Sequence, residues 1–210
     1  PTCKENLTDI PFMVDHICDD CKDHFEKLQK YLKEMDVVRP QTIVDGLYEK
    51  ITKTKGYDRL ARVHKRLIYE GMNHHIYILG IGEDEDKINK YIKENNLQDT
   101  YTLLGFRDNP YKYVAKCDLF VCSSLREGFS TAITESLVVG TPVVSTLCSG
   151  AQELLGYNNE YGLVVENSEE GIYEGIKKLL EDKESLVYYK QKASERGSFF
   201  SKEKTVKAVE

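Results

Sequence analysis

The sequence predicts an α/β protein built on a doubly wound parallel sheet. Short apolar runs of strand length alternate with longer segments of helical periodicity along most of the 210 residues, a pattern typical of a parallel sheet with helices on both faces. The run 118–124 is apolar without alternation, as expected of a strand buried on both faces. We expect a helical or linker segment over 1–40, one α/β domain over 41–200 and a C-terminal helix over 201–210.

Local signals place the individual elements. Leu60, Val63 and Leu67 follow helical spacing after Asp58, which is expected to cap their helix. Pro110 opens a short helix, because its fixed φ suits the first helical position. The expected strands lie at 42–44, 75–79, 101–104, 118–124, 143–146 and 162–165. The expected helices lie at 22–35, 58–70, 84–94, 110–116, 130–140, 149–155, 168–182, 184–196 and 201–209.

Two carboxylates, Glu127 and Glu135, stand eight positions apart across the turn from a strand into a helix. If this helix begins near Ser130 or Thr131, its free N–H groups and positive dipole end form a place for phosphate at the edge where α/β sheets bind ligands. Glu135 then lies one turn on, about 6 Å along the axis, where its carboxylate can accept two hydrogen bonds from a ribose diol. Glu127 lies on the other side of the phosphates, where a transferred sugar would be.

This stretch resembles the donor-side signature of the retaining GT-B glycosyltransferases, the glycogen-synthase-like group that includes many bacterial capsule, exopolysaccharide and lipid-linked sugar transferases. The resemblance covers about residues 50–200, and its strength is that many spaced motifs agree in order. The matching residues are Glu127-Gly-Phe-Ser130, Glu135, Gly140-Thr-Pro-Val-Val144, Ser149-Gly150 and Glu153-Leu-Leu-Gly156, preceded by Gly80-Ile-Gly82, Leu104-Gly-Phe106 and Asp118.

The resemblance implies one half of an enzyme. A GT-B protein has two Rossmann-like domains facing each other across a cleft, and this chain resembles the C-terminal, donor-binding one, so its partners are a nucleotide-sugar donor, a glycan or lipid-linked acceptor and a missing N-terminal acceptor domain. In this family Glu127 would orient the sugar and Glu135 would hold the ribose. Lys55 and Lys50 would stabilise the leaving diphosphate, although Lys50 stands where the family usually has Arg.

The remaining donor contacts implied by the resemblance come from turns after strands. Gly82 belongs to a Gly-x-Gly turn that brings the backbone close to the donor, and Phe106 and Arg107 stand where the family contacts the base. The N–H groups of Ser130 and Thr131 would face the diphosphate, beside the loop that carries Gly128 and Phe129. The sugar, the base, the linkage and the acceptor are not readable from these residues.

Two features have metal-like spacing, and neither is interpreted as a metal site. Asp84-Glu-Asp86 has the D-x-D pattern of the other major glycosyltransferase fold, but acidic residues are also favoured in the first turn of a helix by its dipole. Cys18 and Cys21 form a Cys-x-x-Cys pair with neighbouring histidines, but a second ligand pair usual for structural zinc is missing. We expect no metal and no cofactor besides the donor.

Charge and hydropathy restrict the partners. The net charge is −6, from 29 basic and 35 acidic residues, which argues against nucleic acid. No apolar stretch approaches the 18 residues of a membrane helix, so the expected location is the cytoplasm, with any attachment to the inner membrane face made through the absent domain. Two alternatives stay open: a nucleotide-sugar epimerase of similar fold and a non-catalytic nucleotide-binding module. The Glu–Glu spacing with Gly-Phe-Ser favours sugar transfer.

Overall fold

A computed structural model describes residues 41–46 and 50–200 of the chain. The helices expected at 22–35 and 201–209 and the pair Cys18 and Cys21 lie outside the described residues.

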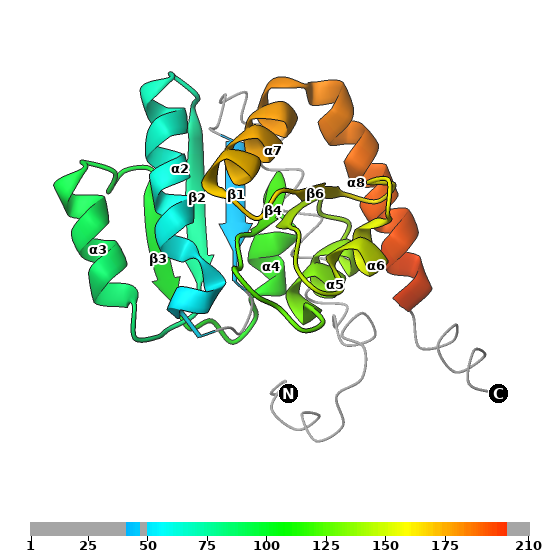
Figure 1. Cartoon of the computed structure of the whole chain (residues 1–210), viewed down its shortest axis with the longest axis horizontal. Coiled ribbons are helices and arrows are strands. Elements are labelled where there is room, and N and C mark those ends of the chain that lie inside the picture. Colours follow the sequence, from blue (N-terminus) through cyan, green and yellow to red (C-terminus); the bar gives the residue numbers. More distant parts are fainter. Residues whose placement is uncertain (1–40, 47–49, 201–210) are drawn as a thin grey trace.

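The described residues form a six-stranded sheet in the order β3-β2-β1-β4-β5-β6 (Figure 1). Every pair of neighbouring strands is parallel, which confirms the predicted Rossmann-like, doubly wound α/β fold. The strands are β1 (Gln41–Asp45), β2 (His74–Leu79), β3 (Tyr101–Gly105), β4 (Leu119–Cys122), β5 (Val143–Thr146) and β6 (Leu163–Val165).

β1, the first strand of this sheet in the sequence, lies in the middle of the sheet and not at an edge. β2 and β3 add outward on one side of β1, and the chain then crosses back to add β4, β5 and β6 on the other. β1 and β4 are therefore neighbours, with Ile43 opposite Leu119 and Val44 opposite Phe120. A reversal of strand order opens a crevice at the carboxyl ends of the two strands, where α/β proteins bind ligands. The segments that follow β1 and β4 meet at that edge.

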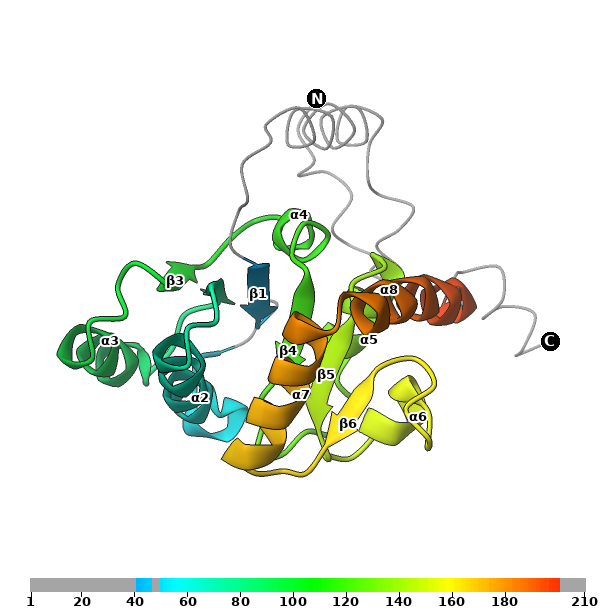
Figure 2. The same ribbon diagram turned by 90° about the horizontal axis from the view of Figure 1, so that it is seen from above.

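Helices cover both faces of the sheet (Figure 2). Successive residues of a strand point to opposite faces, so Ile43 lies in the core with α2, α3 and α7, whereas Val44 lies in the core with α4, α5, α6 and α8. The helices are α2 (Tyr57–Tyr69), α3 (Glu85–Glu94), α4 (Tyr111–Val114), α5 (Thr131–Val138), α6 (Ala151–Leu155), α7 (Glu169–Glu181) and α8 (Lys183–Gly197), with short 3₁₀ helices η2 (Lys53–Lys55) and η3 (Ser198–Phe200).

The last described α-helix, α8, returns across the sheet to pack against α5. The two backbones approach so closely that a Cβ on Gly197 would overlap the carbonyl oxygen of Leu137, and a Cβ on Gly140 would lie 2.6 Å from the hydroxyl oxygen of Ser194. Glycine at 197 and 140 is therefore what lets α8 lie against the end of α5.

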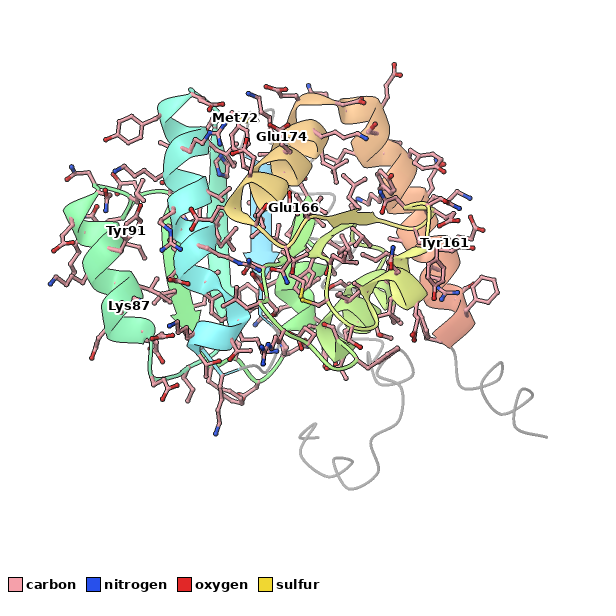
Figure 3. All side chains as sticks on the ribbon, viewed as in Figure 1. Met72, Lys87, Tyr91, Tyr161, Glu166 and Glu174 are labelled. Carbon is pink, nitrogen blue, oxygen red and sulfur yellow. The ribbon has the colours of Figure 1, made fainter. Side chains whose placement is uncertain are left out.

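One predicted cap is wrong. Helix α2 begins at Tyr57, and its N-cap is Gly56 in the left-handed conformation. Asp58 lies inside the first turn, where its carboxylate pairs with Arg62 at 3.2 Å and with Lys87 of α3 at 3.4 Å. Figure 3 shows Lys87, with Tyr91, on α3 beside α2. The negative charge near the N-terminus still suits the helix dipole, but the conformation of Gly56 sets where the helix starts.

Candidate functional site

An ion pair of two predicted site residues lies at the edge of the sheet where β1 and β4 end, the place of the expected crevice. Lys55 and Glu127 are 72 positions apart in sequence, yet Lys55 Nζ lies 2.8 Å from Glu127 Oε1. The same carboxylate oxygen accepts a hydrogen bond of 2.5 Å from the hydroxyl of Ser124. Side-chain exposures of 20% for Lys55 and 11% for Glu127 leave the pair at the surface of the crevice, reachable by a ligand.

Lys55 owes its position to a tight turn. It ends the 3₁₀ helix η2, and the next residue, Gly56, has φ +73°. A Cβ at Gly56 would overlap the carbonyl oxygen of Ser123, so only glycine lets the lysine segment approach the end of β4 this closely. The backbone N–H of Leu125 donates to Thr54 O at 2.7 Å, which ties the two segments together on the other side of the turn.

Helix α5 starts where the sequence predicts. Ser130 is its N-cap and accepts a hydrogen bond of 3.4 Å from Ile133 N, so the first-turn N–H groups beginning at Thr131 are directed toward the crevice edge. Glu135 is half-buried one turn on. A Cβ at Gly150 would lie 3.2 Å from Gly128 O, so the loop after β5 supports the loop that carries Gly128.

Two other predicted contacts have structural roles in this conformation. Gly82 packs against Ile51, whose carbonyl oxygen a Cβ at Gly82 would overlap, and its N–H donates to Glu85 Oε1 at 2.5 Å. Lys50 is exposed and its backbone bridges to Ile81. The donor roles of Gly82 and Lys50 stay predictions, and the first-turn placement of Glu85 and Asp86 on α3 agrees with the expectation from the helix dipole.

Exposed apolar side chains gather along the same edge. Phe106 follows β3 and is 55% exposed, and Phe129 follows β4 and is 56% exposed. Arg107 is also exposed beside Phe106. Further large exposed apolar residues lie in the loops after β2, β4 and β5, at Ile81, Leu125 and Leu147. Large apolar side chains left in water at the ligand-binding edge of a sheet indicate a surface that contacts a ligand or another domain.

A buried polar network beneath the ion pair was missed by the sequence analysis. Asp45, at the end of β1, accepts from Ser123 N at 3.3 Å and from Ser123 Oγ at 2.7 Å. Arg59 donates to the carbonyl oxygens of Ser123 and Ser124. Thr146, at the end of β5, donates to Ser124 O at 2.6 Å. Polar residues at the ends of apolar strands are a signal that would have singled out Asp45 and Thr146.

Among the residues that the structure describes, no group of three or more His, Cys, Asp or Glu side chains could hold a metal ion. Within the same residues, no helix has the length and apolar character needed to span a membrane.

Known proteins with related sequences include several glycosyltransferases. Residues 46–196 match the model of the family Glycosyl transferases group 1. Over 157 residues the chain is 41% identical to the N-acetylgalactosamine-N,N'-diacetylbacillosaminyl-diphospho-undecaprenol 4-alpha-N-acetylgalactosaminyltransferase of Campylobacter jejuni, covering 74% of this chain and 42% of that protein. It is 33% identical to an uncharacterized glycosyltransferase of Methanocaldococcus jannaschii, over 66% of this chain and 38% of that protein. The chain therefore spans about two fifths of the length of these relatives.

Some further sequence matches are short. A stretch of 49 residues, 22% of the chain, is 67% identical to part of histidine–tRNA ligase from Clostridioides difficile. It covers 12% of that protein, a share too small to show membership of its family.

Solved structures show the same fold. Staphylococcus aureus TarM, in complex with fondaparinux, alpha-GlcNAc-glycerol and UDP, superposes with a TM-score of 0.71 at 23% identity, over 86% of this chain and 41% of that one. The C-terminal domain of a glycosyl transferase group 1 protein, LpcC of Francisella tularensis, gives 0.68 at 20% identity, over 81% of this chain and 90% of that one. The architecture is thus one half of a GT-B fold, and by its match over residues 46–196 the chain belongs to the Glycosyl transferases group 1 family.

Proposed function

We propose that this chain is the donor-binding domain of a retaining glycosyltransferase that moves a sugar from a nucleoside-diphosphate sugar to a glycan or lipid-linked acceptor. The observation that carries the proposal is the Lys55–Glu127 ion pair of 2.8 Å in the crevice between β1 and β4. It puts a cation for phosphate and a carboxylate for sugar hydroxyls side by side, next to the N-terminus of α5.

The charges suit departure of a diphosphate. When the bond between the anomeric carbon and the diphosphate oxygen breaks, the leaving group gains negative charge, which Lys55 and the first-turn N–H groups of α5 stabilise. On donor binding Lys55 exchanges the Glu127 carboxylate for the distal phosphate, and this exchange releases Glu127 to accept hydrogen bonds from the sugar. Glu135, one turn along α5, accepts hydrogen bonds from the ribose hydroxyls.

Retention requires attack from the face that the diphosphate leaves. The acceptor oxygen forms the new bond to the anomeric carbon on that face, and a phosphate oxygen of the departing diphosphate takes the acceptor proton. Lys55 and α5 supply positive charge for this step, so we propose that it needs no metal ion. The acceptor is held by a second domain, which would also make any contact with the inner membrane face from the cytoplasm.

Relatives suggest the chemistry of the substrates. The Campylobacter protein is named for transfer of N-acetylgalactosamine to a diphospho-undecaprenol carrier, and solved neighbours of the fold were crystallised with UDP. We therefore propose a UDP-sugar as donor and a lipid-linked saccharide as acceptor, in the synthesis of a bacterial surface polysaccharide.

Calorimetric titration of the chain with UDP, GDP, ADP and UMP, each with and without EDTA, tests this proposal. We expect binding of a nucleoside diphosphate that survives EDTA, and a preference for the diphosphate over the monophosphate. Lys55→Ala should remove a charge-assisted contact of about 1.5–3 kcal/mol from the diphosphate and change monophosphate binding little.

Lys53→Ala is the matched control, because Lys53 is an exposed lysine of the same 3₁₀ helix and should leave the preference unchanged. Equal losses for UDP and UMP in Lys55→Ala would contradict the diphosphate role. Binding that disappears in EDTA and returns with Mn²⁺ or Mg²⁺ would contradict the metal-free mechanism.

A further inference from the structure

Arg59 is a buried arginine with an unusual set of partners. It lies in the first turn of α2 and is 5% exposed. Its Nε donates to Ser123 O at 2.7 Å, and its Nη2 donates to Ser123 O at 2.5 Å and to Ser124 O at 2.7 Å. A guanidinium is costly to bury unless its donors are satisfied, and here Nε and Nη2 donate to two consecutive carbonyl oxygens.

These two carbonyls belong to consecutive serines that contact both partners of the ion pair. Ser124, whose carbonyl Arg59 holds, donates its hydroxyl to Glu127 Oε1 at 2.5 Å, the same oxygen that lies 2.8 Å from Lys55 Nζ. Ser123 Oγ, which also contacts Asp45, lies 3.0 Å from Lys55 O. The orientation of the Ser123–Ser124 peptide therefore sets where Glu127 and Lys55 meet.

The neighbours of Arg59 fit this role. A Cβ at Gly56 would lie 2.8 Å from Arg59 Nε, so the glycine after Lys55 also makes room for the guanidinium. Asp45, at the end of β1, accepts a hydrogen bond from the hydroxyl of Ser123, and Thr146, at the end of β5, donates one to the carbonyl of Ser124. Only Arg59 contacts both carbonyls among these three, because its fork presents several N–H donors in one plane.

We infer that Arg59 is a positioning residue for the donor site: its forked contact with Ser123 O and Ser124 O aligns both serines, and through them the backbone of Lys55 and the carboxylate of Glu127. It contacts neither donor nor sugar and acts on the diphosphate through Lys55. This inference rests on the proposed function, because it assumes that Lys55 binds the distal phosphate.

The test is a double-mutant cycle in nucleotide affinity, measured by calorimetry on the whole chain. If Arg59 acts through Lys55, Arg59→Met should lower the preference for UDP over UMP about tenfold or more, as Lys55→Ala does. The variant with both substitutions should lose no more than Lys55→Ala alone, because residues of one network do not act additively. A merely structural role would weaken UDP and UMP together and add to the loss in Lys55→Ala.

Two further variants sharpen the cycle. Arg59→Lys keeps the charge but not the forked guanidinium, so it should lower the preference for UDP over UMP as Arg59→Met does. If Arg59→Met does not fold, Arg59→Lys alone provides the test. Arg62→Met removes an exposed arginine one turn on, which pairs with Asp58 and Glu169, and should leave the preference unchanged.

The outcomes separate the inference from the proposed function. A wild-type chain with no preference for diphosphate would overturn both. A preference that Lys55→Ala reduces, but that a folded Arg59→Lys or Arg59→Met keeps, would overturn the positioning role alone. Additive losses in the double variant would do the same.

Discussion

At the scale of single residues, Glu135 carries the proposed contact with the ribose. Its place one turn into α5 follows from the start of that helix at Thr131, and a carboxylate there accepts from a diol. We expect Glu135→Ala to weaken UDP binding by about 1.5–3 kcal/mol, the worth of charge-assisted hydrogen bonds.

Comparison of UDP with 2′-deoxy-UDP makes this prediction specific. The wild-type chain should prefer UDP, and Glu135→Ala should bind the two nucleotides alike. A variant that keeps its preference for the ribose would show that another residue reads the 2′-hydroxyl.

Gly56 shows how a single residue without a side chain can hold two segments together. Gly56→Ala should destabilise the chain through two effects: the strain of φ +73° for an L-residue, about 1–2 kcal/mol, and the overlap of its Cβ with Ser123 O. Gly71→Ala is the matched control, because Gly71 has φ +85° but nothing within 4 Å of an added Cβ.

Urea unfolding of the two variants separates the effects. The excess loss in Gly56→Ala over Gly71→Ala measures the close approach of the Lys55 segment to β4. Equal losses would mean that the contact between these segments relaxes freely, and that Gly56 is required only for its dihedral angles.

At the scale of elements, α2 and β2 are joined by a chain of neutral histidines. His74 Nδ1 lies 3.0 Å from Met72 O, His74 Nε2 lies 2.8 Å from His64 Nδ1, and His64 Nε2 lies 2.9 Å from Thr100 Oγ1. Because the carbonyl of Met72 can only accept, His74 Nδ1 carries the proton, and each neutral ring then donates once and accepts once. An added proton would bring a positive charge into this buried pair, which burial disfavours.

Stability should therefore fall as the pH falls below neutrality. Burial lowers the pKa of His64 to about 2 and that of His74 to about 4, from an ordinary value of 6.5. Below pH 6.5 the two histidines are protonated in the unfolded chain but stay neutral in the folded chain. The free energy of unfolding therefore falls as the pH drops from 6.5 to the folded-state pKa values. The expected slope is roughly 1.4 kcal/mol per pH unit for each histidine.

Urea unfolding at pH 7.0, 6.0 and 5.5 measures this slope above the range where carboxylates titrate. Replacing both histidines, as His64→Gln with His74→Gln, should lower stability at pH 7 but flatten the pH dependence. An unchanged slope in that double variant would assign the effect to other groups.

The elements themselves were largely predictable, because their signals are local. Pro110 lies at the N-cap of α4 as the last residue before it, and Ser130 caps α5. The cap of α2 was predicted wrongly at Asp58, because the close approach of Ser123 that requires glycine at position 56 is a contact remote in sequence. Arg59 was missed for the same reason, since its acceptor in Ser123 lies 64 positions away. Local pattern predicted where Lys55 and Glu127 lie on their elements, but their contact depends on the crossing that brings β4 beside β1.

At the scale of the whole molecule, the described residues hold every proposed donor contact and no second domain. We expect the chain alone to bind a donor nucleotide and to transfer no sugar. Transfer needs an acceptor hydroxyl held about 3–3.5 Å from the anomeric carbon. In the proposed enzyme, the opposite domain both positions this hydroxyl and excludes water.

The test compares sugar transfer by this chain and by a longer protein that adds an acceptor domain. Each is incubated with labelled UDP-sugars and a lysate of candidate acceptors. The chain should show nucleotide binding by calorimetry and product near background. Sugar transfer by the chain at a rate close to that of the longer protein would show that one half of the fold suffices.

The packing of α8 against α5 has a consequence for synthesis of the chain on the ribosome. A nascent chain that has reached the end of α7 already contains every residue proposed to touch the donor, but Leu137 of α5 still lacks the backbone of Gly197 against which it lies. Because translation runs from the N-terminus, α8 is the last described α-helix to leave the ribosome. Helix α5, which carries Glu135, can be packed against α8 only then. Nucleotide stabilises only a domain that can bind it, so we expect the proposed donor to protect chains in which α8 has packed against α5 and to leave chains that stop before α8 open to proteolysis.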